Sequence, residues 1–380
     1  MIFHYQYNTS QKIQIHFKYS ADSIVSLLTK ENTAIHSSLK TIEWKDNKLI
    51  MIDQTKLPNE LIFVEFTDYN QVANAIKTMV VRGAPAIGVS GAFGLALAAL
   101  QSSVTTKEEL IRELEIAKKI LFETRPTAVN LKWGLEAIMK VANTGTTVTE
   151  IKESVVQTAK KMAEDDVQIN MAMGKHGSEL FNDNDTIMTH CNAGALATVA
   201  YGTALGVIRA TKDSGKNIKV IATETRPVQQ GSRLTAFELK HDGIDVSLIP
   251  DTAVGYTMAK GLVNKIIVGA DRVLRTGHVF NKIGTYQIAL IAKQHGIPFY
   301  VASPLSTFDM KSNPEDVVIE HRNGSEVTGI GDKKTAPEGI NVINPAFDMT
   351  TPELISGIIT EKGVARAPYE ESIKKLFEAN

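Results

Sequence analysis

The only cysteine among the 380 residues, Cys191, lies in a turn that could hold a ligand. The turn follows a β-branched run at 186–189 and leads into an alanine- and glycine-rich stretch at 195–209, a pattern that predicts strand, turn and helix. Sheets of α/β proteins bind ligands at such turns, because helix N-termini direct free N–H groups there. A helix N-terminus would favour the thiolate of Cys191; the alternative is a small buried hydrophobe, as most free cysteines are.

Asp271 has a comparable position, shortly after the apolar run 266–268. A carboxyl group at the end of a fully apolar strand would be partly desolvated, which raises its pKa toward the range useful for general acid catalysis. The alternative is a structural ion pair between Asp271 and the adjacent Arg272.

Cationic and amide side chains at other turns would suit an anionic ligand. Arg82 and Arg125 each lead a turn that opens a helix, although a glycine-rich turn alone is a weak sign of phosphate binding. The segment 224–233 carries two arginines and two glutamines, which suits a phosphorylated or polyol ligand; a solvated loop is the alternative for Arg233. Lys282 is predicted to open a helix, where a cation opposes the helix dipole unless an anion lies nearby. Together with the thiol and the carboxyl, these groups predict a cleft enzyme that acts on a sugar phosphate.

The second half of the chain, 174–380, is predicted to form a Rossmann-like catalytic domain. Buried strands are expected at 186–189, 219–222, 245–249, 265–268 and 298–302. Helical patterns separate them, at 195–209, 231–240, 251–261 and 282–295. This alternation predicts a parallel sheet with right-handed crossovers. Asp251 is expected to cap its helix, 350–353 to start a closing helix, and 324–339 to form a polar surface loop.

Residues 41–173 are predicted to form a mainly helical N-terminal domain with a small β element. A hairpin is expected over 41–52 and a further strand over 61–66. Apolar spacing of three and four predicts helices at 71–79, 86–100, 107–122, 131–141 and 149–173. The fold class is therefore α/β, and residues 1–40 are interpreted as an N-terminal appendage.

Composition excludes several classes of protein. The formal net charge of −1 gives no electrostatic footprint for nucleic acid or an anionic membrane. One cysteine excludes an intrachain disulfide framework, and the lack of a visible signal peptide favours a cytoplasmic protein. The charge-free run 83–106 is long enough to span a bilayer, but it is mostly alanine and glycine and is expected to be a buried helix instead.

The chain resembles the methylthioribose-1-phosphate isomerase family, which is shared with the regulatory subunits of the translation-initiation guanine-nucleotide exchange factor. The matching stretches, in order, are VRGAPAIG (81–88), RPTAVNLKWGL (125–135), THCNAGALAT (189–198), ETRPVQQGSRLTAFEL (224–239), GADR (269–272), NKIGTYQIALIAKQHGIPFYVASPLSTFD (281–309) and NPAFDMTTPELISGIITEKGV (344–364). Regulatory relatives usually lack the cysteine in THCNAG and the aspartate in GADR, so the resemblance is to the enzymes.

The resemblance implies that Cys191 and Asp271 are the catalytic pair. It implies substrate contacts, chiefly to the phosphate, from Arg82, Gly83, Ala84, Arg125, Gln230, Asn281 and Lys282. It also implies a homodimer that works in methionine salvage with no metal and no organic cofactor. Two departures stand out: residues 1–40 precede the usual start, and Arg275 and His278 lie where many members carry smaller residues. Related isomerases act on 5-deoxyribose-1-phosphate or ribose-1,5-bisphosphate, so the substituent at the sugar 5-position stays open.

The residues suit the chemistry of an aldose 1-phosphate, whose anomeric oxygen is esterified. Its ring C–O bond must break with proton donation to the ring oxygen, which a protonated Asp271 could supply. Hydrogen must then move from C2 to C1, by an enediol-type intermediate or a hydride shift. Cys191 would act as the base or would stabilise developing charge. A non-catalytic sugar-phosphate sensor is the competing interpretation. A Rossmann dehydrogenase is excluded, because no G-x-G-x-x-G follows the first strand.

Overall fold

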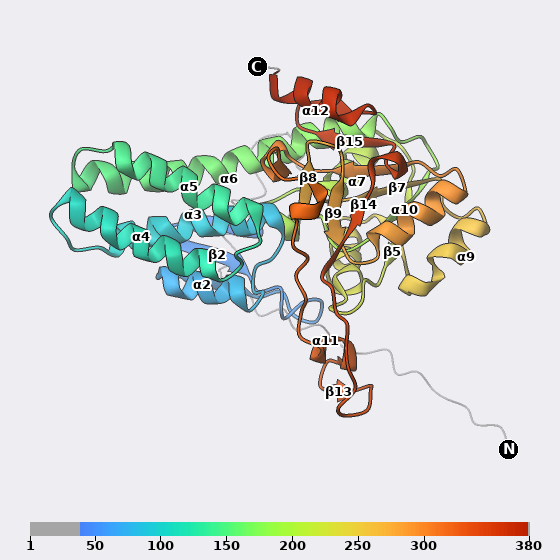
Figure 1. Cartoon of the computed structure of the whole chain (residues 1–380), viewed down its shortest axis with the longest axis horizontal. Coiled ribbons are helices and arrows are strands. Elements are labelled where there is room, and N and C mark those ends of the chain that lie inside the picture. Colours follow the sequence, from blue (N-terminus) through green and yellow to red (C-terminus); the bar gives the residue numbers. More distant parts are fainter. Residues whose placement is uncertain (1–38, 379–380) are drawn as a thin grey trace, which may run out of the picture. The chain divides into compact units, whose positions relative to one another are not determined.

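The computed structural model describes residues 39–378, which belong to one compact unit. The interpretation of residues 1–40 as an appendage therefore lies outside the described residues, except at Leu39 and Lys40. The rest of the chain has the predicted fold class: a mainly helical first part with a small antiparallel sheet, followed by a largely parallel sheet (Figure 1).

The first part begins with a three-stranded antiparallel sheet, β1 (Ile42–Lys45), β2 (Lys48–Ile52) and β3 (Phe63–Phe66). Asp46 and Asn47 turn β1 into β2 with positive φ angles of 50° and 57°, a conformation that these two residue types tolerate. Five helices follow: α2 (Tyr69–Lys77), α3 (Ala84–Gln101), α4 (Lys107–Glu123), α5 (Val129–Thr144) and α6 (Val148–Ser178).

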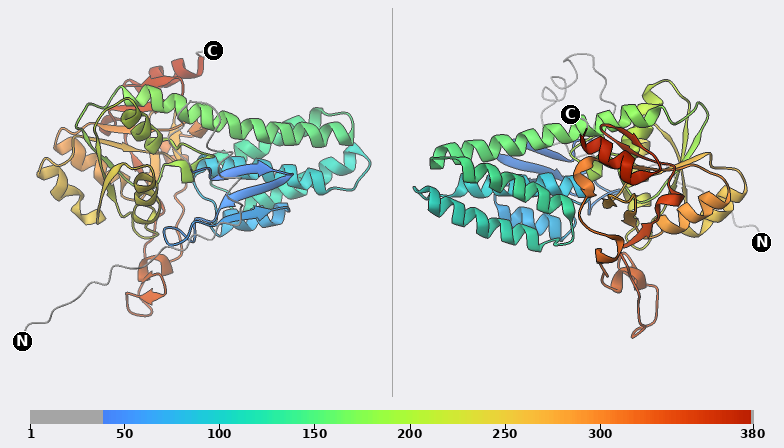
Figure 2. Two further views of the ribbon diagram at one scale, coloured as in Figure 1. Left: turned by 180° about the vertical axis from the view of Figure 1, so that it is seen from behind. Right: turned by 45° about the horizontal axis from the view of Figure 1, so that its top comes forward.

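Helix α3 is the centre of this helical part: it packs against α2, α4, α5 and α6 (Figure 1; Figure 2 shows the helical part from two further sides). Its length and composition would suffice to cross a membrane, but 78% of it is buried inside the protein. Its glycines let other helices approach closely: a Cβ on Gly88 would lie 2.8 Å from the carbonyl oxygen of Asn130 in α5. The charge-free run is thus a core helix packed on all sides, as predicted.

A seven-stranded sheet forms the second part, with the strand order β16-β15-β10-β7-β4-β5-β6. Six strands are parallel: β4 (Thr186–Thr189), β5 (Lys219–Thr223), β6 (Asp245–Ile249), β7 (Lys265–Val268), β10 (Phe299–Ala302) and β15 (Gly357–Thr360). The edge strand β16 (Gly363–Ala365) pairs antiparallel with β15. From β4 the chain adds β5 and then β6 on one side of β4, and it later adds β7, β10 and β15 on the other side. The strand order therefore reverses between β4 and β7. That reversal is where open α/β sheets bind ligands.

Helices cover both faces of this sheet. Apolar side chains of α6, α7 (Ala204–Asp213) and α8 (Ala236–His241) form the core on one face. Those of α9 (Val254–Ala259), α10 (Thr285–Gln294) and α12 (Tyr369–Glu378) form it on the other. Helix α6 also packs against α7 and β15, and it runs across residue 173. The predicted boundary between the two domains therefore falls inside a helix, and the division into domains stays a prediction.

Three predicted helices differ from the structure. After β4 only a single 3-10 turn forms, at Ala195–Ala197, and the helix starts at Ala204, because the chain between them is drawn back to pair Gly194 with Gly202. The closing helix expected from 350–353 was wrong: a 3-10 turn, Pro352–Leu354, separates β14 (Phe347–Thr350) from β15.

The third difference concerns Lys282, which does not open a helix. It ends β9 (Val279–Lys282), part of an unpredicted four-stranded sheet completed by β8 (Arg272–Leu274), β11 (Phe308–Asp309) and β14. Helix α10 starts only at Thr285. The predicted polar loop 324–339 is mostly exposed, and it contains a short helix, α11 (Ser325–Thr328), and the hairpin of β12 (Gly329–Ile330) and β13 (Lys333–Lys334).

A buried carboxyl in α6 gives a prediction for stability. Asp166 accepts the N–H of Val199 at 2.8 Å, and no ion pair to it occurs within residues 39–378. Burial raises its pKa from 3.8 to about 7. The folded state then keeps a proton that the unfolded state loses, so stability falls as pH rises from about 4 to about 7, by up to about 4 kcal/mol. The thermal midpoint of Asp166→Asn, relative to that of the parent, should therefore be higher at pH 8 than at pH 5, measured by scanning fluorimetry. Equal differences at both pH values would contradict this.

Candidate active site

One pocket, partly open to solvent, lies at the reversal of strand order and reaches the helical part. Cys191 follows β4 and Asp271 follows β7, so the two neighbouring strands bring them to the same edge of the sheet. All nine predicted site residues line this pocket: Cys191, Asp271, Arg82, Gly83, Ala84, Arg125, Gln230, Asn281 and Lys282. Their roles remain predictions, but their juxtaposition is a property of the fold.

Cys191 is fixed through its backbone. Its φ angle is 63°, its N–H donates to Thr225 Oγ1 at 2.9 Å, and its carbonyl accepts from Thr235 Oγ1 at 2.6 Å. The prediction that a helix N-terminus favours its thiolate was wrong, because only a 3-10 turn follows. Burial raises the pKa of the thiol, and the nearby charges of Lys282 and Arg82 oppose this without reversing it. Burial therefore favours the thiol over the thiolate, so a role of Cys191 as a base would use the ionised minority.

Asp271 has the environment that its sequence position predicts. Desolvation raises the pKa of its carboxyl, against the opposing effects of Lys282, Arg125 and Arg82. The alternative pairing with Arg272 does not occur, since Arg272 donates to Asp309 at 2.9 Å. A carboxyl with a raised pKa that lines a pocket and has no ion pair among the described residues is suited to proton donation.

Arg82 enters the pocket just before the first turn of α3. Its Nη1 donates to the carbonyl of Asn192 at 2.8 Å and its Nη2 to Oδ1 of the same residue, while its buried Nε lacks a partner among the described residues. Gly83 has φ 101°, and a Cβ there would lie 2.5 Å from the backbone of Ala197, so only glycine fits. Gly83, Ala84 and Pro85 also line the pocket, and the unpaired N–H groups of a first helical turn suit a phosphate.

Two further cations come from separate elements. Arg125 precedes α5 and lies 3.6 Å from Glu320. Lys282 donates to the carbonyl of Ala346 at 3.0 Å and lies 4.6 Å above the ring of Phe347. With Arg82 they give the pocket three cations from three segments, an arrangement suited to one phosphate dianion.

The two amides differ in how they are held. Gln230 is buried and its Oε1 lacks a partner within the described residues. It directly precedes a π-helical turn, Gly231–Thr235, a feature often found at functional sites. Asn281 is also buried, and its Nδ2 donates to Thr285 Oγ1 at 3.0 Å.

Three charged residues considered from the sequence lie outside the pocket lining and make structural contacts. Arg226 donates to the carbonyl of Val327 at 3.0 Å, and Arg233 to that of Gln54 at 2.9 Å. Asp251 does not cap its own helix, because its carboxylate accepts the N–H groups of Thr225 and Arg226 at 2.8 and 2.6 Å. It thereby holds the turn after β5 rather than the helix after β6.

Two pocket residues could not be found from the sequence. His190 is buried, and burial lowers the pKa of its imidazole, so the ring is neutral. Its Nε2–H donates to the Ile283 carbonyl at 2.9 Å, and its Nδ1 accepts from the Thr223 hydroxyl at 2.6 Å. Arg322 comes from an irregular segment that carried no motif. It is neutralised by Glu326, at 2.9 Å from its Nε, and lies 3.5 Å from Glu320.

The fold and the pocket together define a class: a Rossmann-like α/β protein whose sheet reversal carries a thiol, a carboxyl and a set of cations suited to an anionic small molecule. Within that class the chain belongs to the initiation factor 2 subunit family, whose sequence model matches residues 80–367. The resemblance seen in the sequence is thereby confirmed.

Related proteins carry two kinds of name. The methylthioribose-1-phosphate isomerase of Thermosipho africanus is 53% identical over 339 residues, covering 89% of this chain and 98% of that protein. The Pyrococcus horikoshii OT3 structure of 5-methylthioribose 1-phosphate isomerase has a TM-score of 0.85 at 43% identity, covering 97% of this chain and 100% of that one. The A. fulgidus structure of translation initiation factor eIF-2B, subunit delta, has a TM-score of 0.81 at 50% identity, covering 90% and 100%.

Proposed function

We propose that the protein is an aldose–ketose isomerase that converts 5-methylthioribose-1-phosphate to 5-methylthioribulose-1-phosphate in methionine salvage. The observation that carries this proposal is the placement of Cys191 and Asp271 in one pocket, after neighbouring strands, beside three cations. Relatives that are about half identical over most of the chain bear the name of this enzyme.

The proposed mechanism divides the work among these residues. Arg82, Arg125 and Lys282 hold the phosphate, which stays attached to C1. Asp271 gives its proton to the ring oxygen as the ring C–O bond breaks. Cys191 then assists the transfer of hydrogen from C2 to C1, either as a base or by stabilising the charge that develops. The carbonyl forms at C2 as the 2-hydroxyl gives up its proton, which restores the acid form of Asp271, so the product is the ketose. The pocket limits the access of water to the intermediate.

A non-catalytic regulatory role is the second candidate, and the A. fulgidus relative named as an initiation-factor subunit favours it. A regulatory subunit would need the phosphate contacts but neither the thiol nor the acid.

We expect a soluble homodimer in the cytoplasm, as the family resemblance implies; light scattering after gel filtration would measure the oligomeric state.

The preferred substrate should be methylthioribose-1-phosphate or 5-deoxyribose-1-phosphate rather than ribose-1,5-bisphosphate. Arg275, the unusual cation, lies outside the pocket lining and pairs with the exposed Glu370 at 2.7 Å. Arg322 is paired with Glu326, at 2.9 Å from its Nε. A second phosphate would therefore be desolvated with no further unpaired cation among the described residues of the pocket lining. We expect this to lower kcat/KM for the bisphosphate by roughly tenfold or more.

The measurement is kcat/KM for the three sugar phosphates with the parent and with Arg275→Ala. Arg275→Ala should change none of the three values. A higher value for the bisphosphate that is lost in Arg275→Ala would overturn the substrate assignment while leaving the isomerase mechanism intact. No turnover of any of the three would overturn the proposed function itself.

A further inference from the structure

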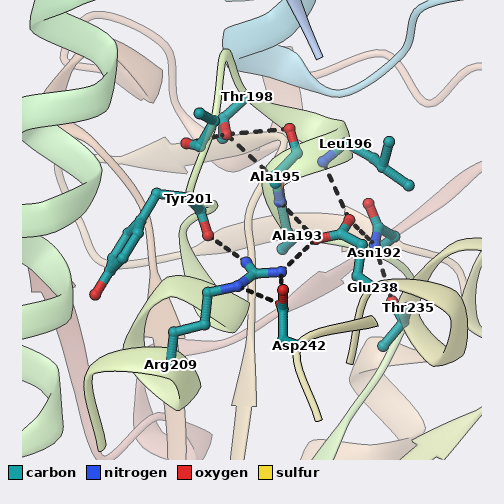
Figure 3. Close-up of polar contacts among 12 residues, drawn as sticks. Asn192, Ala193, Ala195, Leu196, Thr198, Tyr201, Arg209, Thr235, Glu238 and Asp242 are labelled. Atoms are coloured by element: carbon teal, nitrogen blue, oxygen red, sulfur yellow. Dashed lines mark hydrogen bonds and ion pairs between the residues drawn. The ribbon is translucent and has the colours of Figure 1, made fainter. Parts of the chain in front are cut away.

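Glu238 in α8 is a fully buried carboxylate that takes no part in the proposed mechanism, yet it holds the turn that carries Cys191 (Figure 3). Its Oε2 accepts the N–H of Ala195 at 2.7 Å, and its Oε1 accepts the N–H of Leu196 at 3.1 Å. These two bonds satisfy backbone groups at the start of the 3-10 turn. The path of the chain between Cys191 and Leu196 is thereby fixed.

Glu238 also fixes the orientation of the Asn192 amide. The Nδ2 of Asn192 donates to Glu238 Oε1 at 2.9 Å and to Thr235 Oγ1 at 3.1 Å. A carboxylate can only accept hydrogen bonds, so Nδ2 must face Glu238 and Oδ1 must face away from it. Oδ1 and the carbonyl of Asn192 are the two groups that accept from the guanidinium of Arg82.

The charge of Glu238 is balanced on another side by Arg209 of α7, as Figure 3 shows. Arg209 Nη2 lies 2.8 Å from Glu238 Oε2, its Nε donates to Asp242 at 2.7 Å, and its Nη1 donates to the Tyr201 carbonyl. Its side chain is only 1% exposed, so the group is dry.

Gly194 makes this approach possible. A Cβ at position 194 would lie 2.2 Å from Glu238 Oε2, closer than any real contact. Because residue 194 has no side chain, the Glu238 carboxylate can lie directly against the backbone of the turn. Any side chain at position 194 would displace that carboxylate.

We propose that Glu238 and Asn192 are positioning residues that hold the Arg82 guanidinium in the orientation needed to bind the substrate phosphate. The chain of contacts runs from Glu238 to the Asn192 amide and from Oδ1 of that amide to Arg82. This inference rests on the proposed function only in taking the phosphate as the anion that Arg82 binds.

The test compares Asn192→Ala and Glu238→Gln with a matched control, Asp242→Asn. Asp242 pairs with the same Arg209 but contacts neither the turn nor the pocket. KM, kcat, the Kd of inorganic phosphate by calorimetry and the thermal midpoint are measured for each.

Asn192→Ala should raise the phosphate Kd and KM roughly tenfold or more, because a hydrogen bond to a charged group is worth one to two decades of affinity, and should change kcat less. Glu238→Gln, which permits the Asn192 amide to flip, should do the same. Asp242→Asn should lower the thermal midpoint and leave the phosphate Kd unchanged.

A double-mutant cycle with Arg82→Ala separates a relay from direct contact of Asn192 with the substrate. In the Arg82→Ala background, Asn192→Ala should cost almost nothing further. The proposal is overturned if Asn192→Ala costs as much there as in the parent, if Asp242→Asn weakens phosphate binding equally, or if the parent binds no phosphate at all. Phosphate binding without turnover would refute the proposed function alone, and the cycle would still decide the relay. If Asn192→Ala does not fold, Glu238→Gln carries the same comparison.

Discussion

Replacement of Asp271 by asparagine should leave substrate binding intact and lower kcat by about 10²–10⁴-fold, the usual contribution of a general acid. Asparagine keeps the shape of the side chain but has no proton to give to the ring oxygen. A general acid must be protonated to act, and desolvation raises the pKa of the Asp271 carboxyl. The parent should therefore lose activity as pH rises through that pKa. The high-pH limb of the kcat profile should therefore be absent from the residual activity of Asp271→Asn.

The matched control for this prediction is Asp309→Asn. Asp309 is the carboxylate that pairs with Arg272, next to Asp271 in the chain, but it does not line the pocket. The Asp309→Asn variant should lose some thermal stability and keep kcat within about threefold of the parent, a change much smaller than the loss of a general acid would cause. An Asp271→Asn variant within the same threefold would return Asp271 to a structural role.

Loss of the thiol should have the second large effect. Cys191→Ala should lower kcat by about 10²-fold or more if the thiol acts as a base or stabilises charge, with little change in KM. Iodoacetamide should also inactivate the protein, slowly at neutral pH and faster as pH rises, because burial raises the pKa of the thiol. Bound substrate should slow the reaction.

The chain has one cysteine, so mass spectrometry gives the extent of alkylation at Cys191 without ambiguity. Full alkylation that leaves turnover intact would show that Cys191 has no catalytic role. An unreactive thiol would not, since a partly closed pocket also excludes the reagent.

The parallel sheet could be predicted because its strands are short apolar runs that alternate with helical patterns. The edge on which Cys191 and Asp271 meet follows from that alternation, since both come after predicted strands. The start of α7 could not be predicted: the stretch after Cys191 has helical composition, but tertiary contacts with Glu238 hold its first residues in another conformation. Lys282 was misplaced for a similar reason, because β9 exists only by pairing with β8 and β14, which are distant or very short.

The roles of Glu238 and Arg322 depend on contacts between segments far apart in the chain. Glu238 lies within a matching motif, yet only the fold shows that it reaches Asn192, 46 residues earlier. Arg322 approaches the pocket through an isolated bridge between His321 and Pro345. Neither pattern nor composition carries that information.

The central claim is that this pocket moves hydrogen from C2 to C1 of an aldose 1-phosphate. Proton and phosphorus NMR of the purified protein with 5-methylthioribose-1-phosphate tests it most directly, with Asp271→Asn in parallel. The account predicts that the anomeric proton signal disappears, that C1 methylene protons of a ketose coupled to phosphorus replace it, and that no inorganic phosphate is released. An unchanged aldose spectrum, or release of inorganic phosphate without ketose, would contradict it.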